Sequence, residues 1–365
     1  MKKILIINYD KKNYGGASKN LSLISNLLKI NKFDVDTIYI DNNLKKNSPK
    51  FFKNYFYSNY YLFNFLEKFK FYIDYLKSRY LLKLKKEKYN FILFKNYRAI
   101  HLAKKISNNQ SKLIYLCSGF IISDFTSYKN LDICSKKIIY KSVYEEYVFK
   151  NSDKIFVNSN ISKKIIYKNY NYKKNIDIIW TSTFSYTNQV DDSVNKKKYD
   201  LIFSCSNFER EEKNVNFFLN LLNILSKNLK ILIIGNNQKK AFKSKNIIQK
   251  NYLTKEKLDT LLQQTKIALI PSKFDSSPNL FFESFDNNCI PLVSKNCGIP
   301  SEFKNFQINN FDIKKWSSKI IKILDNYQHE FNKNKIYKNV INNLRKNNET
   351  FFVSQFQSGS IKENE

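Results

Sequence analysis

The sequence has little of what marks several functional classes. In 365 residues it holds two histidines, six glycines, five prolines and five cysteines, none of them in a CxxC pair. An odd number of cysteines without that spacing argues against both a disulfide framework and a zinc site, and favours a reducing compartment. The opening MKKILIINYD offers four apolar residues in a row, whereas a signal peptide needs about 7–15 and a membrane helix about 18. We therefore expect a cytoplasmic protein without a resident metal or cofactor.

Arginine is also scarce, although the chain is strongly basic. The formal net charge is +32, yet four of the 63 basic residues are arginines. Proteins that bind nucleic acid favour arginine, because its guanidinium group makes paired contacts with phosphate and guanine. Lys, Asn, Ile, Phe and Tyr are all enriched, and their codons are rich in A and T, so codon bias accounts for the charge. We expect no nucleic-acid partner.

What is present is a repeated pattern of short apolar runs, each followed by a helical pattern. Runs that are apolar throughout are typical of strands buried on both faces of a parallel sheet. Alternation with helices predicts an α/β fold of two Rossmann-like, doubly wound domains. We place them at residues 1–184 and 199–335, joined by a linker at 185–198 and followed by C-terminal helices over 336–365 that can return to the first domain. The runs are Ile4–Ile7, Val35–Ile40, Phe91–Phe94, Leu113–Leu116, Lys154–Val157, Ile176–Ile179, Leu201–Phe203, Ile231–Ile234, Ile267–Ile270 and Ile290–Val293.

Three segments could carry chemistry, and the first is Gly15-Gly16 between the first strand and an amphipathic helix. Two glycines at a helix N-terminus leave its amide groups open to an anion such as phosphate. A simple turn explains the pair equally well. Gly119, Gly235 and Gly298 also lie just after strands or in the loops that follow, where we expect positive φ angles or close approach to a ligand.

The second segment is the loop Ser204–Asn214, which lies between a strand and the helix Val215–Leu225. Lys213 stands near the helix start, where a cation could neutralise a diphosphate. Taken by itself, a charged run such as this one is more often a solvated loop.

The third segment pairs two carboxylates across a strand, loop and helix. Asp275 lies in the loop and Glu283, after seven intervening residues, on the helix that follows. Carboxylates in this arrangement can accept hydrogen bonds from hydroxyl groups at two points of one ligand. The spacing leaves open that they are two unrelated surface acids.

Together these segments resemble glycosyltransferase family 4 and its GT-B relatives. PSKFDSSPNLFFESFDNNCIPLVSKNCGIPSEF is similar to the family's donor-site signature, and SCSNFEREEKN to its diphosphate-binding loop. GGASKNLSLISNLL resembles the N-terminal glycine loop, and IIGNNQ the stretch that leads to the signature. The resemblance implies a GT-B fold, in which two Rossmann-like domains face each other across a cleft, and a retaining, metal-independent transfer from a nucleotide sugar to a glycan or lipid-linked acceptor, as in lipopolysaccharide and other cell-surface polysaccharide synthesis.

The resemblance also implies roles for individual residues. Lys213 would neutralise the leaving diphosphate, Asp275 would contact the donor sugar, and Glu283 would hold the ribose hydroxyls. Arg210 would add a second cation, because the family's usual arginine position is Asn207 here. The further donor-binding residues are Gly15, Gly16, Asn207, Gly235, Ser277, Asn279 and Leu280, and the acceptor-side residues are Ser118 and Gly119.

Two departures from the family pattern support an alternative interpretation. The usual arginine is Asn207, and Cys117-Ser118-Gly119 stands where the family often has a sugar-contacting histidine. A catalytically silent GT-B-like binding or scaffold protein is therefore the second hypothesis.

Residues 51–88 combine a helical apolar stripe with extra aromatic residues and lysines. A basic, aromatic amphipathic helix can lie on an anionic bilayer, which would bring the first domain to a lipid-linked acceptor on the inner face of the plasma membrane. A helix covered with codon-biased Lys and Tyr is the alternative.

Overall fold

The structure, a computed structural model, describes residues 1–8, 15–39, 68, 72, 88–120, 142–184, 197–225, 228–238 and 244–357, with backbone only for 15–19. The chain divides into two compact units. Unit 1 comprises Met1–Phe184 with Lys346–Glu365, and unit 2 comprises Ser185–Arg345.

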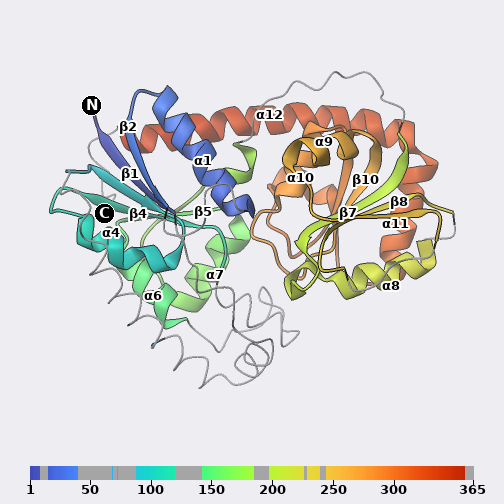
Figure 1. Ribbon diagram of the computed structural model, residues 1–365, viewed down its shortest axis with the longest axis horizontal. Helices are drawn as coiled ribbons and strands as arrows, with labels where there is room; N and C mark the ends of the chain where they lie inside the picture. The colour runs from blue at the N-terminus through green and yellow to red at the C-terminus, as the bar shows by residue number, and fades with distance from the viewer. Residues whose placement is uncertain are drawn as a thin grey trace. The chain divides into compact units, whose positions relative to one another are not determined.

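Unit 1 is built on a six-stranded, wholly parallel sheet in the order β2-β1-β3-β4-β5-β6 (Figure 1). The first strand lies inside the sheet, with β2 on one side and β3 on the other, which is the doubly wound arrangement. The elements are β1 (Lys3–Asn8), α1 (Gly15–Ile30), β2 (Asp34–Tyr39), β3 (Phe91–Phe94), α4 (Ile100–Ile106), β4 (Lys112–Cys117), α6 (Val143–Lys150), β5 (Lys154–Val157), α7 (Asn160–Tyr170) and β6 (Ile176–Ile178).

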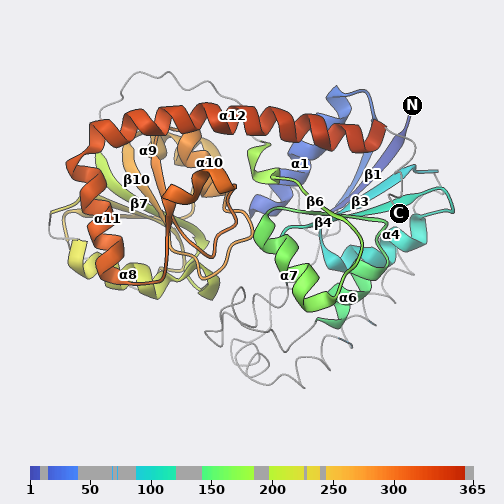
Figure 2. The same ribbon diagram turned by 180° about the vertical axis from the view of Figure 1, so that it is seen from behind.

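Both faces of this sheet are buried, as the continuous apolar runs predict. Alternate residues of β1 point to opposite faces, and Ile4, Leu5, Ile6 and Ile7 are all fully buried. One face packs against α1, while on the other α4, α6 and α7 cover the strands, as Figure 2 shows from behind.

Unit 2 repeats the plan, with a parallel sheet in the order β12-β11-β10-β7-β8-β9 (Figure 1). The apolar runs predict four of its strands, and the structure adds two short edge strands, β9 and β12. The elements are β7 (Tyr199–Asn207), α8 (Val215–Leu225), β8 (Ile231–Asn236), β9 (Ile247–Lys250), α9 (Lys255–Gln263), β10 (Thr265–Ile270), α10 (Asn279–Asp286), β11 (Ile290–Ser294), β12 (Gln307–Ile308), α11 (Ile313–Asp325) and α12 (Tyr327–Gln357).

The last helix, α12, contributes to both units. Its first part is held in unit 2, where Arg345 makes a paired contact with Asp286 at 2.9 and 3.2 Å. Its last turns belong to unit 1, where Phe352 and Phe356 are fully buried in the core. Unit 2 thus extends to Arg345, beyond the residue 335 expected from the sequence, because that contact ties the helix to α10.

Asparagine takes most of the left-handed backbone positions in the described part of the chain. Five asparagines have positive φ angles, as does Lys32, whereas Gly235 is the one glycine there that does. Among the described glycines, positive φ is thus confirmed for Gly235 alone, and the alternative expectation, close approach to a ligand, stays a prediction for the others. Asn tolerates this conformation better than other residues with a Cβ, because its short amide can bond to the local backbone. The asparagines are Asn171, Asn214, Asn237, Asn288 and Asn310.

Several predictions fall where the structure gives no description. The basic segment 51–88 lies outside the described residues except for Lys68, Tyr72 and Lys88, and so does the linker 185–198 except for its last two residues. The cleft between the domains stays a prediction. None of the described helices is long and apolar enough to cross a membrane.

Candidate functional site

The candidate site of unit 2 lies where its strand order reverses. Strand β7 has β8 on one side and β10 on the other, so the loops after β7 and β10 leave the sheet in neighbouring positions. In open α/β sheets the ligand crevice forms at this point, outside the carboxyl ends of the strands. The loop after β7 carries Lys213 and the loop after β10 carries Asp275, so the topology brings the two predicted residues to the same place.

Lys213 and Asp275 form a direct ion pair. The Lys213 Nζ donates to Asp275 Oδ2 at 2.5 Å, and both side chains are largely shielded from solvent. Burial lowers the pKa of Lys213, but the charge and hydrogen bond of Asp275 outweigh it and leave the pKa above its ordinary value. Lys213 is therefore a fixed cation at neutral pH.

The backbone around Asp275 is held as firmly as its side chain. Asp275 forms an isolated parallel bridge with Cys297, and its carbonyl accepts from the Gly298 amide at 2.8 Å. Its second carboxylate oxygen, Oδ1, accepts from the Ser277 amide at 3.1 Å. Since a short side chain on a fixed backbone has few rotamers, the loop sets the direction of the carboxylate and of the lysine bound to it.

Arg210 lies on the same loop as Lys213 and is half exposed. Its Nε donates to Glu212 Oε1 at 2.6 Å, and its Nη1 donates to Ser206 Oγ at 3.3 Å. The charges of Lys213 and Arg210 both lower the pKa of the buried Cys205 thiol, which burial raises to about 11. Both cations are thus close to the end of β7, and Arg210 shares its charge with Glu212.

Asn207 and Gly235 shape the carboxyl ends of β7 and β8. The Asn207 Oδ1 accepts from the Glu209 amide at 2.8 Å and from Asn237 Nδ2 at 3.2 Å. A Cβ at Gly235 would lie 2.5 Å from the Cys205 carbonyl oxygen and 2.8 Å from the Phe208 ring. Close packing of the two strand ends therefore accounts for this glycine, and its predicted contact with the donor stays a prediction.

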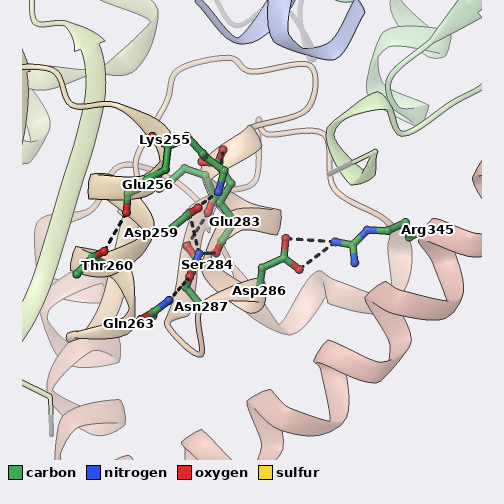
Figure 3. Close-up of polar contacts among 11 residues, drawn as sticks. Lys255, Glu256, Asp259, Thr260, Gln263, Glu283, Ser284, Asp286, Asn287 and Arg345 are labelled. Carbon is green, nitrogen blue, oxygen red and sulfur yellow. Dashed lines mark hydrogen bonds and ion pairs between the residues drawn. The ribbon is translucent and has the colours of Figure 1, made fainter. Parts of the chain in front are cut away.

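Glu283 lies on α10, in a second polar cluster drawn in Figure 3. Its Oε1 is 3.8 Å from Lys255 Nζ, and Lys255 also pairs with Asp259 one turn along α9. The predicted donor residues Asn279 and Leu280 are the first two residues of α10, where backbone amides have no acceptor within the helix. The structure thus groups Lys213, Asp275, Ser277 and Arg210 in one set of loops, and Glu283 with α9.

The remaining predicted residues belong to unit 1. Gly15 and Gly16 are the first residues of α1, for which the backbone alone is described. Ser118 and Gly119 follow β4, and the Gly119 carbonyl accepts a weak hydrogen bond from Cys117 Sγ at 3.6 Å. A Cβ at Gly119 would meet no atom within 4 Å, so this glycine borders open space.

Comparison with known sequences identifies the domain that carries this geometry. Residues 185–347, which span unit 2, match the family described as Glycosyl transferases group 1. The chain carries a glycosyl transferases group 1 domain. By this domain the protein is a glycosyltransferase. No curated protein sequence matches the chain at a significant level.

Solved structures extend the likeness to the whole chain. Sucrose-phosphate synthase from Thermosynechococcus elongatus is 11% identical with a TM-score of 0.66, over 98% of each chain. HepE from Anabaena, in complex with UDP and glucose, is 10% identical with a TM-score of 0.62, over 98% of this chain and 99% of its own. WaaG, a glycosyltransferase involved in lipopolysaccharide biosynthesis, is 10% identical with a TM-score of 0.55, over 96% and 95%. At these identities the likeness concerns the fold, and it confirms the expected GT-B class of two Rossmann-like units.

Sequence reasoning missed the partners of the glycosyltransferase's Glu283. Lys255 pairs with this carboxylate, Asp259 pairs with Lys255, and Asn287 donates a hydrogen bond to Asp259 (Figure 3). Burial raises the pKa of the Tyr252 phenol, and the charge of Glu283 raises it further. The i,i+4 spacing of Lys255 and Asp259 was a visible signal of an ion pair, but it gave no indication of which face of α9 meets α10.

The described part of the glycosyltransferase contains no group of three or more His, Cys, Asp and Glu side chains placed to hold a metal ion.

Proposed function

We propose that this glycosyltransferase moves a sugar, with retention of anomeric configuration, from a nucleotide-sugar donor to a glycan or lipid-linked saccharide acceptor in cell-surface polysaccharide synthesis. The observation that carries the proposal is the Lys213–Asp275 pair at the switch point of unit 2. The printed titles of two similar structures, one with UDP and glucose and one involved in lipopolysaccharide biosynthesis, support the class of donor and pathway. Retention rests on the family resemblance.

The reaction itself explains why a fixed cation is needed here. When the bond between the sugar C1 and the diphosphate oxygen breaks, negative charge develops on the leaving nucleoside diphosphate. A preorganised donor of positive charge stabilises that state without reorganisation, and removal of one such donor typically costs about 10²–10³ in rate. In this proposal Lys213 faces the diphosphate, with Arg210 beside it, and protein cations supply the charge that a metal would otherwise provide.

The remaining roles follow the donor along its length. Asp275 accepts from a sugar hydroxyl, the amides of Asn279 and Leu280 face the phosphates or the sugar, and Glu283 accepts from the ribose hydroxyls. Ser118 and Gly119 bind the acceptor, and the glycine pair Gly15 and Gly16 binds the donor. The protein acts in the cytoplasm, and its basic segment 51–88 contacts the inner face of the plasma membrane, a proposal that rests on the sequence pattern of that segment.

The first test is thermal stabilisation by a panel of nucleoside diphosphates and nucleotide sugars. A ligand at 100 times its Kd adds about 2.7 kcal/mol to stability, which raises the melting temperature measurably. We expect one nucleotide to stabilise the wild type, and Lys213→Ala and Glu283→Ala to lose that effect. Lys257→Ala is the matched control, because Lys257 is an exposed residue of α9 and should leave the stabilisation unchanged.

The outcomes separate the two hypotheses. Stabilisation followed by release of nucleoside diphosphate in the presence of a saccharide acceptor supports transfer. Stabilisation without release from any acceptor favours the silent binding protein. Absence of stabilisation by every nucleotide in the panel would overturn the proposed donor site.

A further inference from the structure

The cluster around Glu283 contains a lysine in an unusual place. Lys255 is the first residue of α9, where the positive end of the helix dipole disfavours a cation. Its Nζ pairs with Asp259 one turn further on and lies 3.8 Å from Glu283 Oε1. The two carboxylates offset the unfavourable dipole and fix the lysine between α9 and α10.

Asp259 is itself held by a hydrogen bond from a buried side-chain amide. The Asn287 Nδ2 donates to Asp259 Oδ1 and to the Glu283 carbonyl, both at 2.9 Å. Asn287 is 2% exposed, and its own Oδ1 accepts from Gln263 Nε2 at 3.2 Å. A continuous chain of polar contacts therefore runs from a buried amide through Asp259 and Lys255 to the Glu283 carboxylate (Figure 3).

Lys255 attracts the Glu283 carboxylate by charge, without a short hydrogen bond to it. A separation of 3.8 Å between nitrogen and oxygen is within ion-pair range and longer than a hydrogen bond. The Glu283 side chain is 13% exposed and that of Lys255 28%, so solvent screens this attraction less than at an open surface. The ammonium of Lys255 thus orients the carboxylate by charge, without a hydrogen bond of its own to it.

We propose that Lys255 is a positioning residue, which holds the Glu283 carboxylate in the orientation that receives the two ribose hydroxyls of the donor nucleotide. This inference rests on the proposed function of Glu283. Asp259 and Asn287 act behind Lys255 by limiting its rotamers. Because the nucleotide touches Glu283 and not Lys255, loss of the lysine weakens the ribose contact and leaves the diphosphate and sugar contacts in place.

The test compares ribose with dideoxyribose nucleotides. Calorimetry measures the Kd of the stabilising nucleoside diphosphate and of its 2′,3′-dideoxy form for the wild type, Lys255→Met, Lys255→Arg and Glu283→Gln. We expect Lys255→Met to weaken the ribonucleotide about fivefold to tenfold, the size of a coupling between contacting residues, and to leave the dideoxy form unchanged. Lys255→Arg restores most of the loss, and Glu283→Gln removes the preference for ribose.

A matched control and the kinetics complete the design. Lys257→Met removes the same charge from an exposed position of α9 and should match the wild type with both ligands. In turnover, Lys255→Met raises KM for the nucleotide sugar and leaves kcat nearly unchanged.

Each result decides one of the two proposals. Equal weakening of both nucleotides by Lys255→Met, or no weakening of either, overturns the positioning role while the donor site stands. If the wild type binds no nucleotide at all, the proposed function fails, and the inference fails with it.

Discussion

At the scale of single residues, Gly235 shows most directly how packing constrains the site. It lies where the end of β8 approaches the loop after β7, and any Cβ would collide with the Cys205 carbonyl and the Phe208 ring. Phe208 in turn packs edge-on against Phe203 inside unit 2. The glycine therefore permits the close approach of β8 to β7, the strand whose following loop carries Lys213 and Arg210.

Gly235→Ala should destabilise unit 2 by about 1–3 kcal/mol, the usual cost of overpacking a close contact. Backbone and an aromatic ring must both shift to make room. Gly119→Ala is the matched control, because the added methyl meets nothing within 4 Å. Urea denaturation of the three proteins measures the difference, and equal midpoints for the two variants would contradict the packing argument.

The residues of the candidate site differ in how far the sequence predicts them. Lys213, Asp275 and Glu283 stand out because each follows a recognisable strand within a family pattern. The residues that pair with them cannot be recognised in the same way. The Lys255–Glu283 contact, for example, depends on which face of α9 packs against α10, and tertiary packing decides that. The pairing of Arg210 with Glu212 could not be predicted either, because three acidic and two basic residues stand side by side in this loop and allow several pairs.

At the scale of elements, the last turns of α12 are part of the unit 1 core. Phe352 packs against Phe156 and Phe184 with ring centroids 5.6 Å apart in each case, and against Phe356 at 5.1 Å. Lys2 Nζ donates to the Phe356 carbonyl at 3.1 Å, so the chain's first strand and last helix are joined. A helix from the C-terminus thus covers a face of the N-terminal sheet.

Phe352→Ala should lower the stability of unit 1 by about 3–5 kcal/mol, since it removes a large, fully buried ring and leaves a cavity. Its neighbour Phe351 is 40% exposed, and Phe351→Ala should cost much less. Amide hydrogen exchange in β1 and α1 reports on unit 1 specifically. Similar exchange rates in both variants would show that the helix end does not support this core.

Strands were predictable where they are buried on both faces. All ten apolar runs coincide with strands of the structure. Strands β9 and β12 were missed because they form the sheet edge, where β9 alternates between half-buried and exposed residues and β12 has two residues. Such short edge strands are held in the extended conformation by pairing with the adjacent strand, so their own sequence has little strand pattern.

At the scale of the whole molecule, the four described cysteines are free and buried. Burial raises the pKa of Cys289 and Cys297 to about 12 and that of Cys205 to about 11, and raises the pKa of Cys117 further. The reactive thiolate is therefore rare at neutral pH.

A Cys134→Ser variant removes the one cysteine outside the described residues, and its native form should show no thiol that reacts rapidly with Ellman's reagent. Raising the pH from about 7 to 9 should change this little, because the raised pKa values lie well above that interval. Unfolding in guanidinium should expose all four remaining thiols. A native thiol as reactive as free cysteine would contradict the burial.

The two-unit α/β architecture could be predicted from the order of the apolar runs. The composition argued against a disulfide framework, a zinc site and a nucleic-acid partner. The sequence also allowed the C-terminal helices to return to unit 1, but it did not give the point of transfer, because the helical pattern runs unbroken past residue 335 and nothing local marks Arg345 as the residue after which α12 belongs to unit 1.

The asparagines in left-handed positions bear on how far such sequences can diverge. A turn that needs a positive φ angle most often uses glycine, because glycine has no Cβ to clash there. Here Asn171, Asn214 and Asn288 occupy such positions at the ends of helical segments. Glycine in place of one of these asparagines would change the sequence of the turn and keep its backbone conformation. The same backbone fold is accordingly compatible with as little as 10–11% sequence identity between two chains.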